Sequence, residues 1–143
     1  MIDLAARLLD SRLGRLGVQF GKFGLVGVVG LVVDTAVLYL GLWAGLEFFA
    51  ARIPSFFAAA TTTWALNRAF TFRHADHAPL HRQWAAFVAA NAVGGIVNYA
   101  VSVVLEAGFD VVAAYPFLAV AAGAVSGMFF NFAASKRLVF KGA

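Results

Sequence analysis

Long apolar segments separated by short polar ones dominate this chain. Four of them approach the roughly 20 residues that an α-helix needs to cross a bilayer. Apart from Lys22 near one end, only Asp34 and Arg52 are charged within them. None shows the polar outer face of a helix in a soluble bundle. The pattern predicts four transmembrane helices, over about residues 20–43, 49–66, 84–105 and 112–134.

An amphipathic stretch precedes the first apolar segment. In residues 2–17, apolar side chains recur at helical spacing among Arg7, Asp10 and Arg15. This arrangement suits a helix that lies on an anionic membrane surface, and a disordered terminus is the alternative. We therefore expect an amphipathic interfacial helix over residues 1–17 and a transmembrane domain over residues 18–141.

The two halves of the transmembrane region share a weak internal repeat. Apolar helices match one another easily, so the repeat depends on its glycine and polar positions. It predicts an all-α membrane protein whose four transmembrane helices form two parallel hairpin repeats. The matched positions are residues 19–23 and 83–87, Gly30 and Gly94, Asp34 and Asn98, and residues 67–73 and 135–141.

Basic residues gather at one end of the predicted hairpins. They precede the first span, lie between the second and third, and follow the fourth. The other two loops carry Glu47, Glu106 and Asp110, with Arg52 as their only base. The positive-inside rule then places both termini and the middle loop in the cytoplasm.

The composition argues against several kinds of chemistry. The chain has no cysteine, which excludes disulfides and Cys-ligated zinc. Its three histidines fit no strong metal template and are typical of a solvated loop. We find no catalytic triad and no paired carboxylates. We therefore expect no enzymatic activity, no metal, no cofactor and no nucleic-acid partner.

Asp34 is the candidate that packing explains least well. A carboxylate in an apolar membrane helix needs a partner, a proton or water, and such residues usually serve a function. No lysine or arginine lies near Asp34 in the sequence. We therefore expect it to lack a basic partner and to be neutral or hydrogen-bonded.

Each predicted span also carries a stripe of small or polar residues on one helix face. Polar groups that face lipid would remain unsatisfied, so these stripes should face other helices or a cavity. Packing between helices is the alternative for each of them. The stripe residues that we consider candidates for contact with a ligand are Thr63, Asn98 and Asn131, together with Asp34.

A second group of candidates lies at the basic ends of the spans. Arginine holds phosphate through two parallel charge-assisted hydrogen bonds, so a ring of bases at headgroup depth would bind an anionic lipid. The alternative is charge that only sets the topology. The group comprises Lys22, Asn67, Arg68, Lys136 and Arg137.

Three stretches resemble the GtrA-like family of four-helix membrane proteins. Residues 23–40 are similar to its opening helix, with glycines and a central Asp34. Residues 66–72, Leu-Asn-Arg-Ala-Phe-Thr-Phe, are similar to its second helix end. Residues 135–140 are similar to its closing tail, although Leu138 stands where an aromatic residue is usual. The resemblance covers about residues 18–141.

The resemblance implies work on polyprenyl-phosphate-linked sugars in the bacterial inner membrane. The leading hypothesis is translocation of such a lipid-linked monosaccharide for cell-envelope glycosylation, by a homo-oligomer of two or more copies among membrane lipids. A second hypothesis is a membrane anchor or assembly subunit for a polyprenyl-phosphate glycosyltransferase. A small cation exporter is a third, which the basic cytoplasmic end argues against.

Overall fold

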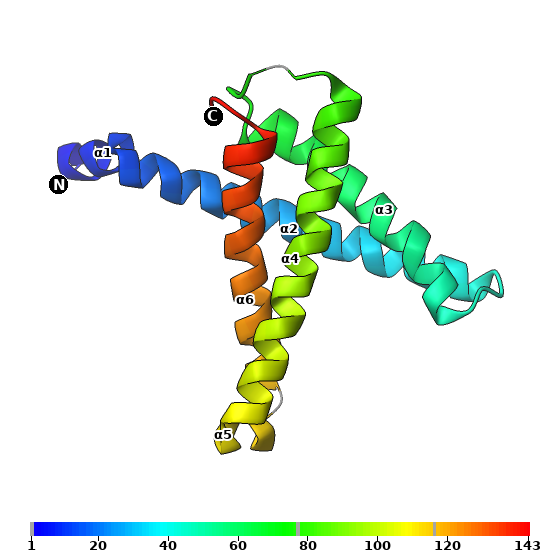
Figure 1. Ribbon diagram of the computed structural model, residues 1–143. Coiled ribbons are helices and arrows are strands. Elements are labelled where there is room, and N and C mark those ends of the chain that lie inside the picture. The colour runs from blue at the N-terminus through cyan, green and yellow to red at the C-terminus, as the bar shows by residue number, and fades with distance from the viewer. Residues whose placement is uncertain (1, 77, 116) are drawn as a thin grey trace. The chain divides into compact units, whose positions relative to one another are not determined.

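The computed structural model describes residues 2–76, 78–115 and 117–143, and the regular secondary structure of these residues is helical. The chain divides into two compact units. The first comprises the residues up to Ala75 with Gly142 and Ala143, and the second comprises Asp76–Lys141. Each unit contains one helical hairpin (Figure 1).

The first hairpin is formed by α2 (Arg12–Trp43) and α3 (Phe48–Leu66), followed by the π-helical turn η1 (Asn67–Thr71). A tight turn joins the two helices. Gly45 adopts a φ of +92°, which favours glycine. The Gly45 and Leu46 amides bond back to the carbonyls of Leu42 and Gly41 at 3.0 Å each, which satisfies the end of α2.

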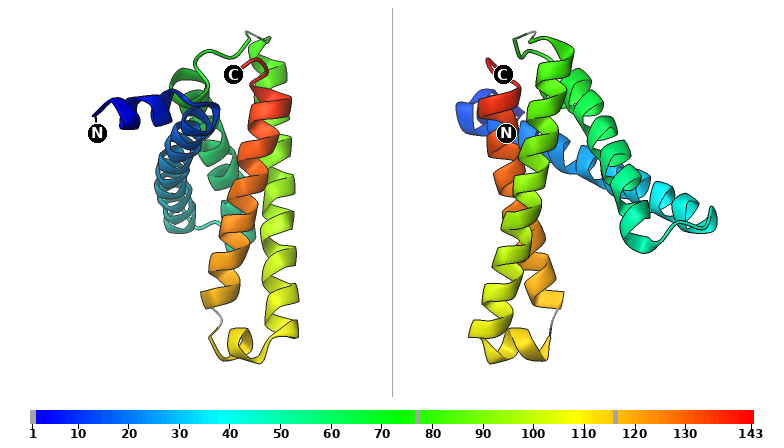
Figure 2. Two further views of the ribbon diagram at one scale, coloured as in Figure 1. Left: turned by 90° about the vertical axis from the view of Figure 1, so that its left-hand side faces the viewer. Right: turned by 45° about the vertical axis from the view of Figure 1, so that its right-hand side comes forward.

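The second hairpin is formed by α4 (Leu80–Gly108) and α6 (Phe117–Ala134), followed by the π-helical turn η2 (Ser135–Val139). The short helix α5 (Asp110–Ala114) connects them. The two long helices of each hairpin pack against each other, and both views of Figure 2 show α4 and α6 side by side. We call the end of a hairpin that holds its connecting turn the turn end, and the opposite end the open end.

The predicted fourth span is broken. One helix was expected over about residues 112–134, whereas the structure has α5 and α6. Tyr115 leaves the helical conformation, with φ −127° and ψ 78°. It precedes a proline, and residues before proline avoid the α-helical region. Pro116 itself lies outside the described residues.

The two hairpins place corresponding residues in corresponding environments. First-helix positions differ by 64 residues and second-helix positions by 68, as for Phe23 and Phe87 or Phe72 and Phe140. All four of these phenylalanines are buried. Phe23 packs on Phe72 with ring centroids 6.2 Å apart, and Phe87 packs on Phe140 at 6.0 Å. Each aromatic pair packs the two helices together at the open end of its hairpin, beside a π-helical turn.

Glycine allows the helices of each hairpin to approach closely. A Cβ atom added to Gly30 of α2 would lie 2.4 Å from Cγ2 of Thr63 on α3. A Cβ atom added to the corresponding Gly94 would lie 1.8 Å from Oδ1 of Asn131 on α6. Both distances are shorter than a van der Waals contact. Small residues at such positions are common where helices pack within a membrane.

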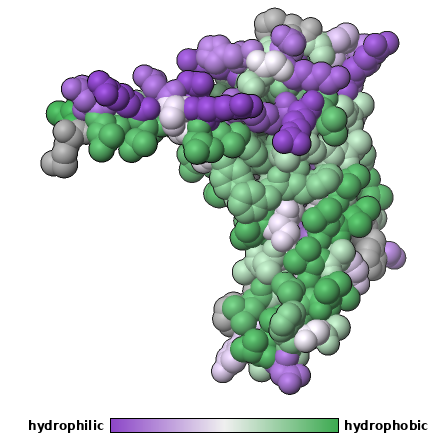
Figure 3. All heavy atoms as spheres, turned by 60° about the vertical axis from the view of Figure 1, so that its left-hand side comes forward, coloured by the Kyte–Doolittle hydropathy of each residue, from purple (hydrophilic) through white to green (hydrophobic). Residues whose placement is uncertain are grey.

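The N-terminal helix α1 (Ile2–Asp10) precedes the first hairpin and contains no buried residue. Its apolar and polar side chains lie on opposite sides (Figure 3). The helix is shorter than the predicted residues 1–17, because Ser11 ends it and begins α2. The Ser11 hydroxyl accepts a hydrogen bond from the Gly14 amide at 3.0 Å, as an N-cap residue does.

Candidate functional site

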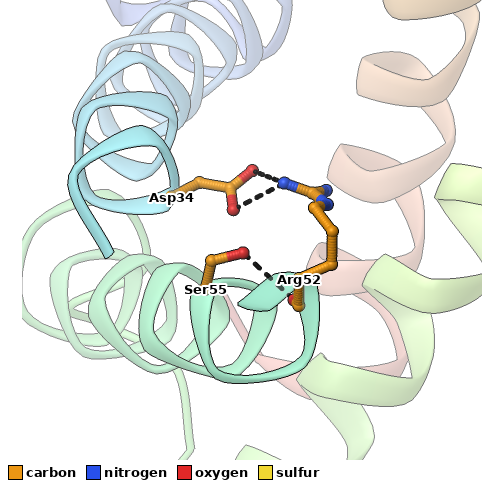
Figure 4. A network of polar contacts seen from close by, with 3 residues as sticks. All are labelled: Asp34, Arg52 and Ser55. Atoms are coloured by element: carbon orange, nitrogen blue, oxygen red, sulfur yellow. Dashed lines mark hydrogen bonds and ion pairs between the residues drawn. The ribbon is translucent and has the colours of Figure 1, made fainter. Parts of the chain in front are cut away.

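Asp34 and Arg52 form an ion pair between the two helices of the first hairpin. Nη1 of Arg52 lies 2.9 Å from Oδ1 of Asp34 and 3.0 Å from Oδ2 (Figure 4). The side chain of Asp34 is 23% exposed and that of Arg52 is 42% exposed. The expectation that Asp34 lacks a basic partner is therefore wrong.

The register of the hairpin explains the pair. Gly30 faces Thr63 and Gly41 faces Ala51, so Asp34 is level with about residues 58 and 59 of α3. Arg52 lies about two helical turns from that level, toward the turn end, and its long side chain reaches back to the carboxylate. The Ser55 hydroxyl, fully buried, donates a hydrogen bond to the Arg52 carbonyl at 3.0 Å. The arginine therefore extends from a firmly packed part of α3.

Arg52 was missed as a partner because it lies far from Asp34 in the sequence and was counted with the charges near the turn, although it was placed near the start of the second predicted span. The second span was expected from about residue 49, and α3 begins at Phe48. A signal was nevertheless present. In a tight antiparallel hairpin, residues at similar distances from the turn face one another, and the long side chain of an arginine within two turns of the facing position can reach a carboxylate.

The predicted bases of the first hairpin lie at its open end. Nζ of Lys22 lies 4.8 Å from the centre of the Phe70 ring, a cation–π contact between α2 and η1. Arg68 lies on the same π-helical turn and is half-buried. Asn67 is buried, and its Oδ1 accepts a hydrogen bond from the Thr71 hydroxyl at 2.7 Å. The open end thus combines two bases with a rigid turn.

The polar residues of the second hairpin meet where α4 and α6 pack together. A Cβ atom on Gly123 would lie 2.4 Å from Oδ1 of Asn98 and 2.2 Å from Oγ of Ser102. The Ser102 hydroxyl donates to the carbonyls of Asn98 and Ala119, each at 2.9 Å. Asn131 is placed against Gly94, and its buried Oδ1 has no hydrogen-bond partner among the described residues.

The bases of the second hairpin repeat the pattern of the first. Lys136 and Arg137 lie on η2, where Lys136 is half-buried and Arg137 is exposed. Ser135, which corresponds to Asn67, is fully buried. Each hairpin therefore ends its second helix in a π-helical turn that carries basic residues. Such turns frequently occur at functional sites.

Several candidates serve packing within their own hairpins. Thr63 donates its hydroxyl to the Ala59 and Ala60 carbonyls at 2.9 and 3.1 Å and presents its methyl group to Gly30. Asn98 and Asn131 contact glycines of the facing helix. These contacts are those that the packing alternative predicts. A role for the same side chains in ligand binding stays a prediction.

Within the described part of the chain, no three histidine, cysteine, aspartate or glutamate residues gather as metal ligands would. His77, one of the three histidines, lies outside that part.

The exposure of the helices defines the class of protein. Within the described residues, α2 and α4 are long and apolar enough to cross a membrane, and only 11% and 6% of their most apolar windows are buried. A core helix of a soluble protein would be mostly buried. Apolar side chains such as Leu25, Leu31 and Ile96 are 64%, 65% and 67% exposed. The chain is a helical membrane protein.

The chain belongs to a family described as the GtrA/DPMS transmembrane domain, which matches residues 22–140. This confirms the family that the sequence motifs resemble. A comparison with curated proteins gave no match. Membership of the family connects the chain with the translocation of lipid-linked sugars.

Proposed function

We propose that this protein translocates a polyprenyl-phosphate-linked monosaccharide across the bacterial inner membrane, for modification of cell-envelope glycans. The observation that carries the proposal is the position of the bases. Arg68 lies on η1, and Lys136 and Arg137 lie on η2, at the open ends of the two hairpins. Bases in this position suit the phosphate of a lipid whose chain stays in the bilayer.

The proposed topology has four membrane-spanning helices and places both open ends in the cytoplasm. α3 and α6 have 19 and 18 residues and are thus about 29 and 27 Å long, close to the roughly 30 Å thickness of the hydrocarbon core. The open ends are basic, whereas the turn ends carry Glu47, Glu106 and Asp110. The positive-inside rule supports this orientation.

In the proposed mechanism, Arg68 and Lys22 in the first hairpin and Lys136 and Arg137 in the second receive the phosphate at the cytoplasmic side. Asp34, Thr63, Asn98 and Asn131 offer hydrogen bonds to sugar hydroxyls deeper in the membrane. The polyprenyl chain remains among the lipids. Four helices enclose little volume, so the transporting unit is a dimer or a larger homo-oligomer. No catalytic step is involved.

The test is flux of a fluorescent short-chain polyprenyl-phosphate sugar in proteoliposomes. The wild-type protein is expected to carry the lipid at a rate well above that of empty vesicles. Arg68→Ala should lower the rate about 10-fold, since one charge-assisted contact to the phosphate is lost. Arg82→Ala is the matched control, because Arg82 is an exposed base of α4 outside the π-helical turns. Flux equal to that of empty vesicles contradicts the proposal.

A second candidate function is a membrane anchor for a polyprenyl-phosphate glycosyltransferase. The hydrogen bonds of Thr63 and Asn67 favour it, because these side chains already have partners within the hairpin. This function predicts stable co-purification with a glycosyltransferase and tolerance of substitutions at Asn98 and Asn131. Loss of lipid flux in those variants argues against it.

The ion pair weakens the third hypothesis, a small cation exporter. That hypothesis depends on an intramembrane carboxylate that alternates between a proton and a cation. The Asp34 carboxylate already has the guanidinium group of Arg52 at 2.9 Å, and an exported cation would have to displace it.

A further inference from the structure

The Asp34–Arg52 pair uses only part of the guanidinium group. Nη1 alone contacts the carboxylate, and it reaches both oxygens (Figure 4). Among the residues that the structure describes, Nε and Nη2 of Arg52 have no hydrogen-bond acceptor. These two nitrogens form the edge with which arginine holds phosphate or carboxylate through two parallel bonds. The pair therefore leaves an oriented binding edge available.

The position of the pair makes that free edge unusual. Asp34 lies 12 residues after Lys22 and nine before Trp43, or about 18 and 14 Å along α2. It therefore lies deep within the part of α2 that crosses the membrane. Donors at such a depth are costly unless water or an anion satisfies them. With 42% of its side chain exposed, Arg52 is accessible to a ligand.

Packing does not account for the pair. The corresponding positions of the second hairpin hold Asn98 and, in the sequence, Val120 (34 + 64 and 52 + 68). That hairpin keeps the buried phenylalanine pair, the glycine contact and the π-helical turn without either charge. A hairpin of this kind therefore packs without the ion pair, and the charges in the first hairpin need another explanation.

We propose that Arg52 is a second phosphate-binding site, which receives the phosphate of the lipid substrate within the membrane through Nε and Nη2. Asp34 is a positioning residue: it holds Nη1 and thereby orients the free edge. Its negative charge also keeps the phosphate from binding too tightly. A transport site must bind its ligand and also release it. The inference rests on the proposed function, because it assigns the next site for the same lipid phosphate.

Binding of farnesyl phosphate to the purified protein in neutral detergent, measured by isothermal titration calorimetry, tests the proposal. Arg52→Ala should weaken binding at least 10-fold, and Arg52→Lys about 3-fold, because lysine keeps the charge but lacks the paired donors. Asp34→Asn should tighten binding about 3-fold or more, since it removes the competing charge. Arg12→Ala, which removes an exposed arginine of α2, is the control and should leave binding unchanged.

Three further measurements keep the result interpretable. Thermal unfolding of each variant in the same detergent shows whether it is folded, and Arg52→Lys replaces Arg52→Ala if the latter is not. Phosphatidylglycerol and inorganic phosphate are titrated in parallel. Tighter binding of either than of farnesyl phosphate would overturn the assignment to the substrate lipid. Equal affinities of the wild type, Arg52→Ala and Asp34→Asn would show that the pair is only structural.

Lipid flux separates this inference from the proposed function. If wild-type protein carries the lipid but Arg52 variants bind farnesyl phosphate normally, the site is wrong and the function stands. If binding depends on Arg52 but flux equals that of empty vesicles, the site stands and translocation is wrong. If both are right, Asp34→Asn binds farnesyl phosphate more tightly and transports the lipid-linked sugar more slowly than the wild type.

Discussion

The first hairpin carries Asp34 and Arg52 as an ion pair between its helices, and the second hairpin has Asn98 and Val120 at the corresponding positions. Both hairpins close their open ends with a buried phenylalanine pair and a π-helical turn. The comparison separates the features that the hairpin fold needs from those that only the first hairpin has. Glycine contacts and buried aromatic rings are shared and belong to the hairpin itself. The two charges of the ion pair occur in the first hairpin and not at the corresponding positions of the second, so the hairpin fold does not require them.

The largest effect is expected where the second hairpin is given a residue of the first. Gly123 corresponds to Ser55 (55 + 68). A Cβ atom at Gly123 would lie 2.5 Å from the Asn98 backbone carbonyl, so Gly123→Ser should destabilise the protein by about 1–3 kcal/mol through overpacking. Thermal unfolding in detergent measures the change. Gly95→Ala is the control, since nothing apart from the neighbouring backbone of its own helix lies within 4 Å of its Cβ position among the described residues. Equal melting temperatures would contradict the close contact.

A smaller effect is expected when the charges of the first hairpin are replaced by the residues of the second. Arg52→Val leaves Asp34 without its cation and should cost about 1–2 kcal/mol, less than for a buried pair because Arg52 is partly exposed. The double variant Asp34→Asn with Arg52→Val should recover most of that loss. The unfolding free energies of the wild type, the two single variants and the double variant form a double-mutant cycle. Additive effects would show that the pair contributes no coupling energy.

The smallest effect is expected when the side chains that face Gly30 and Gly94 are exchanged between the hairpins. Asn131 in the second hairpin corresponds to Thr63 in the first (63 + 68). Asn131→Thr should stabilise the protein by up to about 1 kcal/mol, because it removes a buried oxygen that has no hydrogen-bond partner among the described residues. The reciprocal Thr63→Asn should destabilise it by a similar amount. Denaturation of both variants tests whether stability rises in Asn131→Thr and falls in Thr63→Asn. A loss of stability in Asn131→Thr would indicate that the Asn131 oxygen has a hydrogen-bond partner.

The apolar pattern predicted where the long helices lie, but α2 begins at Arg12 and α4 at Leu80, before the expected residues 20 and 84, because a helix can continue into polar residues beyond an apolar run. The ends at Trp43, Leu66 and Ala134 agree with the structure. The break between α5 and α6 was missed, since the apolar run continues through it and only Pro116 indicates an interruption. The end of α1 at Ser11 was missed because helical spacing continues beyond that serine.

The candidate site was predicted in part, because a sequence shows a residue's chemistry more directly than its partner. Asp34 was recognised from its cost in an apolar helix, but Arg52 was found only when the hairpin register was known. The bases on η1 and η2 were recognised by charge. Their position on π-helical turns depends on which carbonyl each amide selects, as in the 2.8 Å bond from the Phe72 amide to the Asn67 carbonyl.

The length of α2 has a consequence for how the protein meets its bilayer. From Lys22 to Trp43 the helix advances about 32 Å, which matches the roughly 30 Å hydrocarbon core. The ten residues before Lys22, from Arg12 to Gly21, extend it by about 15 Å more, with α1 at the far end. If α1 rests its apolar side on the lipid surface, α2 must tilt, as overlong helices do. Membrane thickness then sets the tilt of the first hairpin, and thinner bilayers tilt it further.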